Sequence, residues 1–340
     1  MSLEHLLGPH RPLPVRVRPV AGESTGSFVA RLARANGLGL AEFLDRVGQG
    51  DGSSDPAQVE KYPQYTEMDV NAAGREYLAV LAGRSVELLR WALPSLADHR
   101  LLSRAGAGAP VWRWTWKAEG GSPVPWCPLC RCRRGIGDPV WLLSADSWQV
   151  CGRHLRWTDD SRGSEPETVD LRALPECVAA QRERRRLEGK FKLAGPELFA
   201  DACQVMYEWW GYAPDSLVWV QRAWTAGLDA RSARAVPLIV LPEAAELAWL
   251  MLRFEQAGQR SRGDRARWLA QVQHRADVWD IDFDAGKDAL LQWLERHSRS
   301  ADGAPAGFAG PRRLVLAARH NRIASRVGSL QQRSCMPGDG

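Results

Sequence analysis

Apolar residues at helical spacing predict several helices in the first hundred residues. In the segment GESTGSFVARLARANG, Phe28, Leu32 and Ala35 share one face, and the Asn-Gly that follows is a helix stop signal. A second, shorter helix is expected directly after it. The same spacing predicts a further pair of helices, with Gly83 ending the first and Ser85 starting the second. The helices expected after the first one are residues 40–47, 77–82 and 86–91.

Each of these two helix pairs has the outline of a helix-turn-helix, a motif that reads DNA by placing its second helix in the major groove. Any two packed helices share that outline, so the pattern is equally typical of an ordinary helical core. Residues 48–56, GQGDGSSDP, are rich in turn formers and are expected to form the loop between the pairs.

A tryptophan-rich strand is expected after residue 110. In VWRWTWK, Trp112, Trp114 and Trp116 alternate with other residues and therefore lie on one face of a strand. Three indoles on one face need burial or a partner. The neighbouring Arg113 and Lys117 leave base stacking open, but a strand that lays its apolar face on a small core is the interpretation we favour.

The second half of the chain is predicted to be mostly helical. The loop segment TDDSRGSEPET precedes it and ends the preceding domain. The most apolar stretch, VPLIVLPEAAELAWLMLRF, contains Pro242, Glu243 and Glu246, which favour a buried helix over a membrane span. The first twenty residues lack the apolar core of a secretion signal. We therefore expect a cytoplasmic protein with no membrane contact.

The composition of the 340 residues is that of a folded globular protein, with 45% hydrophobic and 25% charged residues. Only five of the 45 basic residues are lysines. Arginine forks phosphates and carboxylates and stacks on flat rings, so this balance mildly favours phosphate-bearing partners. A length of this size predicts two or three domains.

Four residues have the spacing of a metal site. Cys127 and Cys130 form a C-x2-C pair, and twenty residues later Cys151 and His154 form a C-x2-H pair. Two such knuckles present four soft ligands to one tetrahedral ion, and zinc is the ion expected. Three thiolates and an imidazole close the coordination shell, so the site is predicted to be structural rather than catalytic.

The remaining cysteines do not extend this pattern. Cys132 competes with Cys130 as a ligand, although its spacing fits a knuckle less well. An odd total of seven cysteines without a secretion signal argues against a disulfide framework. The other three, Cys177, Cys203 and Cys335, are scattered and expected to be free.

Three further stretches of the chain concentrate charge of one sign. In DIDFDAGKD, Asp280, Asp282 and Asp284 resemble a calcium loop, but the required turn glycine is missing, so an acidic helix start is favoured. Residues 181–192, QRERRRLEGKFK, either track a phosphate backbone or form a solvated helix face. Residues 311–333 of the tail contain no acidic residue and either contact nucleic acid or form a basic surface helix. Their arginines are Arg312, Arg313, Arg319, Arg322, Arg326 and Arg333.

Two stretches resemble the TniQ family, which includes the TnsD-type target selectors of transposons. Residues 13–38, LPVRVRPVAGESTGSFVARLARANGL, are similar to the family's opening, with its proline-rich lead, its Glu-Ser pair (Glu23 and Ser24) and a helix that ends in Asn-Gly. Residues 141–155, WLLSADSWQVCGRHL, together with the upstream WCPLC, are similar to the family's zinc motif. The likeness covers roughly the first half of the chain.

The resemblance implies a mainly α fold with a small zinc-binding β-knuckle domain. Residues 1–100 are then the N-terminal helical, helix-turn-helix-like part of a TniQ domain, residues 101–165 its zinc-finger part, and residues 166–340 a C-terminal helical domain with a basic tail. The second zinc motif that some members carry has no counterpart here, since the remaining Cys and His residues are too scattered.

The resemblance also implies a function. An adaptor of this family takes part in DNA transposition: it recognises a target DNA or targeting complex and links it to an AAA+ ATPase, which recruits the transposase. The resemblance also allows two further partners, a guide-RNA complex and a second copy of the chain. The rival interpretation is a zinc-containing, DNA-binding transcription regulator. An enzyme is disfavoured, because no nucleophile elbow, open metal triad or G-x4-G-K-[ST] phosphate loop is present.

Overall fold

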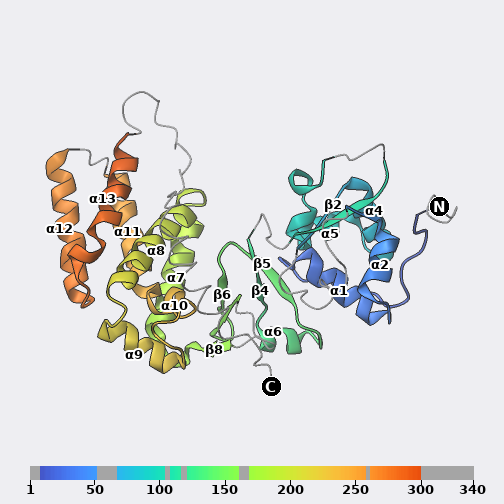
Figure 1. The fold of residues 1–340 in the computed structure, drawn as a ribbon, viewed down its shortest axis with the longest axis horizontal. Helices are drawn as coiled ribbons and strands as arrows, with labels where there is room; N and C mark the ends of the chain where they lie inside the picture. The colour runs from blue at the N-terminus through green and yellow to red at the C-terminus, as the bar shows by residue number, and fades with distance from the viewer. Residues whose placement is uncertain are drawn as a thin grey trace, which may run out of the picture. The chain divides into compact units, whose positions relative to one another are not determined.

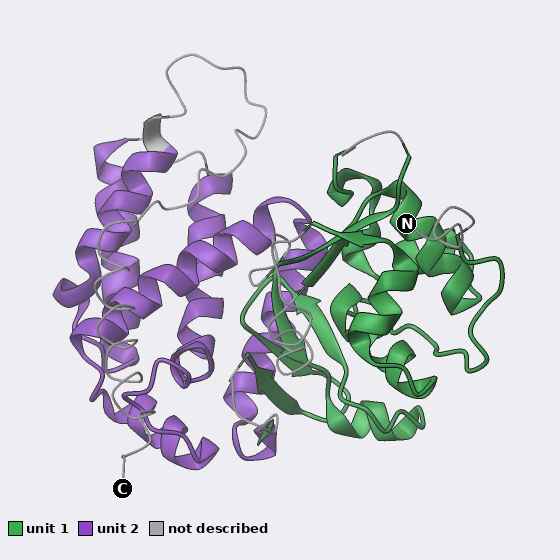
Figure 2. Ribbon diagram, turned by 45° about the vertical axis from the view of Figure 1, so that its right-hand side comes forward, with its two compact units in different colours: residues 1–169 green, residues 170–340 purple. Residues whose placement is uncertain are grey.

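The computed structural model describes residues 8–51, 67–103, 108–115, 121–160, 168–257 and 261–299. The chain divides into two compact units, residues 1–169 and residues 170–340, shown in green and purple in Figure 2. Unit 1 mixes helices with short strands, and unit 2 is helical in the part that the structure describes (Figure 1).

Capping residues mark the ends of several helices in unit 1. Ser24 accepts a hydrogen bond from the Ser27 amide at the start of α1, and Asn71 and Ser85 cap α4 and α5 in the same way. Gly83 adopts the left-handed conformation that ends α4. These helices are α1 (Thr25–Ala35), α2 (Leu40–Val47), α4 (Ala72–Ala82), α5 (Val86–Ala92) and α6 (Pro128–Arg133), with 3-10 turns η3 (Pro94–Leu96) and η4 (Asp98–Arg100).

The strands of unit 1 form three small sheets. In the first, β3 lies between β1 and β2; in the second, β4 pairs with β5; in the third, the order is β6-β7-β8. The pairs β2–β3, β4–β5 and β6–β7 are antiparallel. The strands are β1 (Gln49–Gly50), β2 (Glu67–Val70), β3 (Val111–Thr115), β4 (Ser122–Pro125), β5 (Trp141–Ser144), β6 (Trp148–Cys151), β7 (Arg156–Asp159) and β8 (Thr168–Asp170).

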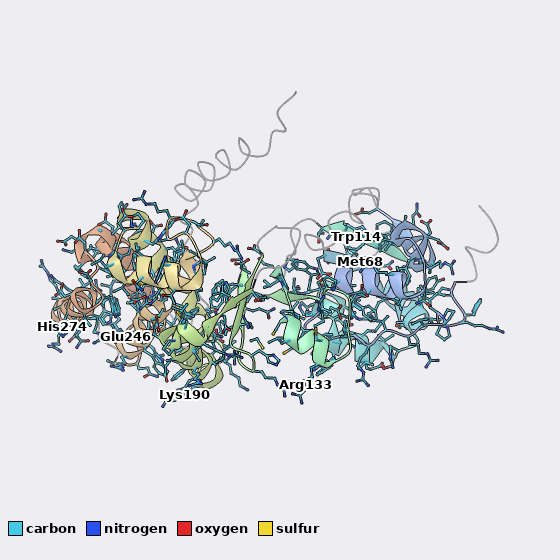
Figure 3. All side chains as sticks on the ribbon, turned by 90° about the horizontal axis from the view of Figure 1, so that it is seen from below. Met68, Trp114, Arg133, Lys190, Glu246 and His274 are labelled. Carbon is cyan, nitrogen blue, oxygen red and sulfur yellow. The ribbon has the colours of Figure 1, made fainter. Side chains whose placement is uncertain are left out.

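The core of unit 1 lies between these helices and the β2–β3 pair. Met68 and Trp114 face each other across the two strands and are almost fully buried (Figure 3). Trp112 is buried as well, and its indole N–H donates to the Gly48 carbonyl oxygen. The prediction that this strand lays its indoles on a core is therefore confirmed for Trp112 and Trp114. Trp116 lies outside the described residues, as does Lys117.

Most of the predicted helices of unit 1 are confirmed, with three corrections. Ala35 is exposed, because the buried face of α1 runs through Phe28, Val29, Leu32 and Ala33 instead. The helix predicted over residues 77–82 starts five residues earlier, at Ala72, directly after its cap Asn71. The predicted loop of residues 48–56 contains the short strand β1, which pairs in parallel with β3; residues 52–56 lie outside the described part.

Unit 2 is a bundle in which α8 packs against α7, α11 and α13. The predicted apolar helix is confirmed as two pieces, α10 and α11, that meet at Val240, next to Pro242. Among the described helices, none combines the length and apolar character that crossing a membrane requires. The elements are η5 (Leu171–Ala173), α7 (Pro175–Lys190), α8 (Ala194–Tyr212), α9 (Leu217–Ala226), α10 (Val236–Ile239), α11 (Leu241–Gln256), α12 (Arg262–Val278) and α13 (Phe283–Arg299).

Two of the charged stretches take up local structural roles in unit 2. Asp282 accepts a hydrogen bond from the Asp284 amide where α13 begins, which confirms the acidic helix start. In the stretch 181–192, Arg184 stacks on Phe199 and pairs with Glu188. That arginine is therefore part of the packing of unit 2 rather than of its solvated face.

Candidate metal centre

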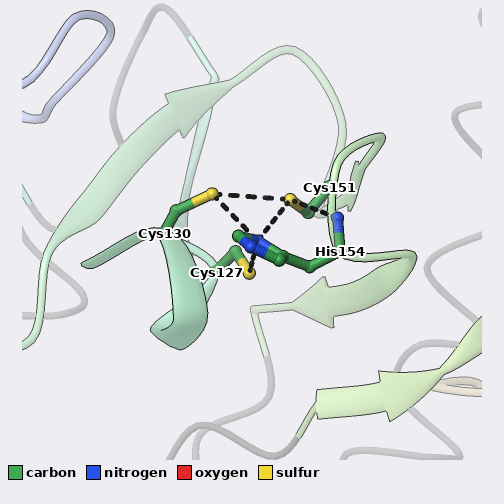
Figure 4. Close-up of side chains that lie close together, drawn as sticks. All are labelled: Cys127, Cys130, Cys151 and His154. Carbon is green, nitrogen blue, oxygen red and sulfur yellow. Dashed lines mark hydrogen bonds between the residues drawn. The ribbon is translucent and has the colours of Figure 1, made fainter. Parts of the chain in front are cut away.

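Two short hairpins and one helical turn bring the four predicted ligands together. Cys127 follows β4 and sits at the N-terminal end of α6, and Cys130 lies in the first turn of that helix, with Pro128 at the position that prolines favour. Cys151 is the last residue of β6, and His154 lies in the turn that leads to β7. The ligand atoms of all four residues lie within 4.8 Å of one another (Figure 4).

The distances fit one four-coordinate ion. An ion bound to sulfur at about 2.3 Å and to nitrogen at about 2.0–2.1 Å in a tetrahedron separates two sulfurs by about 3.8 Å and sulfur from nitrogen by about 3.5 Å. The sulfurs of Cys130 and Cys151 are 3.6 Å apart. The Nδ1 atom of His154 lies 3.5 Å from the sulfur of Cys127, 3.2 Å from that of Cys130 and 3.6 Å from that of Cys151. The donor set and its spacing therefore suit a tetrahedral metal ion.

Hydrogen bonds from backbone amides stabilise the turn that carries His154. The His154 amide donates to the sulfur of Cys151 at 3.4 Å, and the Leu155 amide donates to the Cys151 carbonyl oxygen at 2.8 Å. Leu155 adopts a positive φ of 50°, which a non-glycine residue adopts at a cost of about 1–2 kcal/mol. This reversal returns the chain into β7 directly after the ligand.

Contacts between the two hairpins fix the knuckles relative to each other. The Gln149 side-chain amide donates to the Pro125 carbonyl oxygen at 2.7 Å and so ties β6 to β4. The rings of Trp148 and Trp157 stack with centroids 4.3 Å apart, and both are buried. The two indoles supply most of the apolar packing in this small sheet.

The electrostatics of the cluster couple metal binding to proton release. Burial, and then the neighbouring Cys151 thiol, raise the pKa of Cys130 to about 12. Burial also raises the pKa of Cys127, whereas Cys151 has its pKa lowered by hydrogen bonds from the turn, in spite of its own burial. Because a metal ion binds thiolates, an ion bound here would displace the protons of Cys127 and Cys130.

The cysteine left open as a competitor does not join the cluster. Cys132 is exposed and is not among the four residues whose ligand atoms converge. Cys177 and Cys203 are buried in helices of unit 2. Cys335 lies outside the described residues. Within the described residues, the four predicted ligands are the one group of Cys, His and acidic side chains with the convergence that a metal ion requires.

A buried ion pair lies where α1 meets the β4–β5 hairpin, next to the contacts that join the two. Glu23 is fully buried, and its two carboxylate oxygens accept hydrogen bonds from Nε (2.9 Å) and Nη2 (2.7 Å) of Arg31. Ser27 donates its hydroxyl to Glu23 and accepts a hydrogen bond from the Trp141 amide at 3.0 Å. The Ser24 amide donates to the Trp141 carbonyl oxygen at 2.8 Å. The Glu-Ser pair thereby links α1 to β5, the strand beside the first knuckle.

Four arginines that were not among the predicted site residues lie in the two segments that carry the metal ligands. Arg133, Arg134 and Arg153 are exposed, and Arg131 is partly exposed (Figure 3 labels Arg133). Arg134 lies over the ring of Trp126, 5.1 Å from its centroid. No acidic residue occurs in either knuckle segment, WCPLCRCRRGIG or CGRHLR. The signal was therefore present in the sequence, as arginines interleaved with the ligands.

The predicted DNA-contacting arginines of the tail cannot be placed. Arg312, Arg313, Arg319, Arg322 and Arg326 all lie outside the described residues. The structure thus brings together the four predicted metal ligands but does not relate them to the basic tail.

Comparison with known proteins identifies the first unit. Residues 14–156 match the family model described as TniQ. This range contains the Glu23–Arg31 pair, the helices α1 to α6 and all four members of the metal cluster. No curated protein and no solved structure matches the chain.

Proposed function

We propose that this chain, whose residues 14–156 match the model of the TniQ family, a family associated with target selection in transposition, is an adaptor that selects the site of DNA insertion. In this role it binds a target DNA or a targeting complex and presents it to an AAA+ ATPase, which in turn engages the transposase. The match, which spans both the helices and the metal cluster, is the observation that carries this proposal.

We propose zinc as the resident ion of the cluster. Three sulfur donors and one imidazole at tetrahedral spacing are the ligand set of structural zinc sites. Zinc bound by Cys127, Cys130, Cys151 and His154 supplies folding free energy, because the surrounding sheets are small. All four positions of the ion are taken by protein atoms, so the role proposed for the chain is non-catalytic.

The parts of the chain have different tasks in this proposal. Residues 1–100 and 101–165 act together as one recognition module, since Ser24 and Ser27 at the start of α1 bond the backbone of Trp141 in β5. Residues 166–340 provide further contact surfaces and the basic tail. A regulator that reads one operator needs little beyond a binding domain and a dimerisation surface, so a second unit favours the adaptor.

We propose two sets of arginines as contacts to the DNA backbone. One set is the tail, through Arg312, Arg313, Arg319, Arg322 and Arg326. The other is the knuckle surface of Arg131, Arg133, Arg134 and Arg153, where exposed guanidinium groups surround a rigid metal site without an acidic neighbour in the same segments. Each phosphate contact that is lost should reduce the slope of log affinity against log salt by about 0.9.

An affinity purification from the native host tests the adaptor directly. The tagged chain is recovered with and without nuclease, and the bound proteins are identified by mass spectrometry. An AAA+ ATPase that stays bound after nuclease treatment is the expected result. Recovery of specific DNA with neither an ATPase nor a transposase would overturn the proposal in favour of a transcription regulator.

Matched variants connect the result to the metal cluster. Cys151→Ser removes one ligand and should abolish recovery of the ATPase, because the knuckle loses its ion. Cys132→Ser, an exposed cysteine outside the cluster, is the control and should bind as the parent does. Equal recovery with both variants would show that the metal-bearing hairpins take no part in the partner contact.

A further inference from the structure

A groove in unit 2 has no role in the function proposed above. It lies between α7 and α11 and has a volume of about 640 Å³. Its floor is formed by the buried Ala180 of α7 and Ala245 of α11, with the exposed Ala179 beside them, so the space that larger residues would fill stays open. Trp249, which is partly exposed, and Leu250 continue the apolar lining along α11.

The two helices that form the groove run in the same direction. At their starts, the guanidinium of Arg222 contacts Glu176 of α7 at 3.4 Å and Glu243 of α11 at 2.7 Å. Farther along, Phe191, which directly follows α7, meets Trp249 edge to face with ring centroids 6.4 Å apart. The groove therefore has one end near the helix starts and one near the helix ends, and both are fixed by contacts within unit 2.

The acidic side chains of the groove already have partners. Glu176 contacts Arg222, and Glu183 contacts Arg186 at 3.8 Å. Glu246, which Figure 3 labels, pairs with Arg275 and accepts a hydrogen bond from the indole N–H of Trp279 at 3.1 Å. Their negative charge is thus largely compensated by cations of the same unit.

Two cations at the other end are not compensated. Lys190 is the last residue of α7, and Arg253 lies in the last turn of α11. Both are exposed and line the groove, and within the described residues neither has a carboxylate within 4.0 Å. Arg186 adds a third cation beside the indole of Trp249, 6.0 Å from its centroid. The groove therefore has an apolar floor and a positively charged end.

We propose that this groove binds an amphipathic helix of a partner protein whose apolar residues recur at i, i+3 or i+4, and i+7, and which carries Asp or Glu at one end. An apolar trough between two helices is the complement of such a helix, and the anchors would fill the space above the alanines. Acidic residues at one end meet Lys190 and Arg253, which lack carboxylates of their own.

The chemistry of the groove separates this occupant from two others. A nucleic-acid strand needs cations along its whole path, but here they stand at one end and the rest of the lining is apolar or paired acid. The chain's own tail, residues 311–333, contains six arginines and no acidic residue, so Lys190 and Arg253 would repel it. An amphipathic helix of another protein with acidic residues at one end can place its apolar face on the alanines and its carboxylates beside Lys190 and Arg253.

This inference extends the adaptor proposal to unit 2, but its test uses peptide binding alone. If no peptide binds the groove, the proposed adaptor function of unit 1 is unaffected. If no ATPase is recovered in the purification, the proposed peptide binding of the groove is unaffected. The probe is a displayed library of helical peptides of about 18 residues, or five turns. Each peptide has a fixed leucine stripe, and the remaining positions are randomised among Glu, Lys, Gln and Ala. Selection is made on the full-length protein.

The expected result is enrichment of sequences with Glu at one end of the helix. The best peptide should lose at least about tenfold in affinity on the double variant Lys190→Glu/Arg253→Glu, which corresponds to about 1.4 kcal/mol. The same peptide with Lys in place of its end Glu residues should prefer that double variant. Trp249→Ala should weaken both peptides, and Arg262→Glu, an exposed cation of α12 outside the groove, should change neither.

Three outcomes would overturn the inference. One is that no sequence is enriched over peptides with a scrambled leucine stripe. Another is that the selected peptides bind the charge-reversed double variant as well as the parent. The third is that the double variant loses affinity for a DNA oligonucleotide while no peptide is selected, which would make the groove a nucleic-acid surface. Since Lys190 and Arg253 are exposed, these variants are expected to fold, and a thermal melt of each one checks this.

Discussion

Replacing Arg31 by Met tests whether the buried ion pair holds the metal-bearing hairpin to the helices. The side chains of Arg31 and Glu23 are only 5% and 0% exposed, and two charge-assisted hydrogen bonds join them. Arg31 also donates to the Arg18 carbonyl oxygen at 3.2 Å. In Arg31→Met the carboxylate keeps only its neutral partners, the Ser27 hydroxyl and the Val20 amide.

The expected loss follows from the burial of the pair. Removing one partner of a buried ion pair costs about 3–5 kcal/mol, because the other charge stays buried and uncompensated. The control is Arg46→Met on the neighbouring helix α2. Its pair with Glu42 is about half exposed on both sides, so we expect a loss of only about 0.3–0.5 kcal/mol. The double variant Glu23→Gln/Arg31→Met, which has no buried charge, should recover part of the loss.

Hydrogen exchange followed by mass spectrometry in increasing urea measures this for each unit separately. For a slope of about 2 kcal/mol per molar urea, a loss of 4 kcal/mol moves the midpoint of α1 down by about 2 M. Peptides from α8 in unit 2 report on the same sample and should not shift. An α1 midpoint in Arg31→Met as high as in Arg46→Met would refute the reasoning, because the pair would then contribute no more than a surface contact.

Three further predictions concern metal and pH. Cys151→Ser should lower the bound zinc, measured by plasma mass spectrometry, from about one ion per chain to near zero. Burial raises the pKa of Glu67 to about 7 from its usual 4.5, so the folded state holds the proton more tightly. The free energy of unfolding should therefore fall as the pH rises from 4.5 to 7. Urea unfolding measured at several pH values should show this fall in the parent protein and not in Glu67→Gln. Burial lowers the pKa of His297, but hydrogen bonds to Asp201 and Glu255 outweigh it and raise this pKa to about 9. Its stabilisation is complete below pH 6.5 and should be lost as the pH rises through 9, whereas the melting temperature of His297→Gln should not show this loss.

Some features could be predicted because they depend on residues close together in the chain. The caps Ser24 and Ser85 and the stop glycine Gly83 mark helix ends, since they satisfy backbone groups within one turn. The C-x2-C and C-x2-H pairs identified the metal cluster, because each knuckle is a local turn that presents two ligands. By contrast, the parallel pairing of β1 with β3 joins residues 49 and 111, and no local pattern encodes a contact over that separation.

Short-range spacing and residue chemistry were enough to predict most helices of unit 1, the four Cys and His residues that converge, and the likeness to the TniQ family, because each of these depends on residues close together in the chain. Only the tertiary structure decided which of two neighbouring cysteines joins the cluster: Cys130 points to the shared centre from the first turn of α6, while Cys132 is exposed. It alone also showed that Ser24 and Ser27 join α1 to Trp141 of β5, and that α7 and α11 leave a groove between them. These features depend on where distant side chains meet in space, and packing fixes that only once the whole unit has folded.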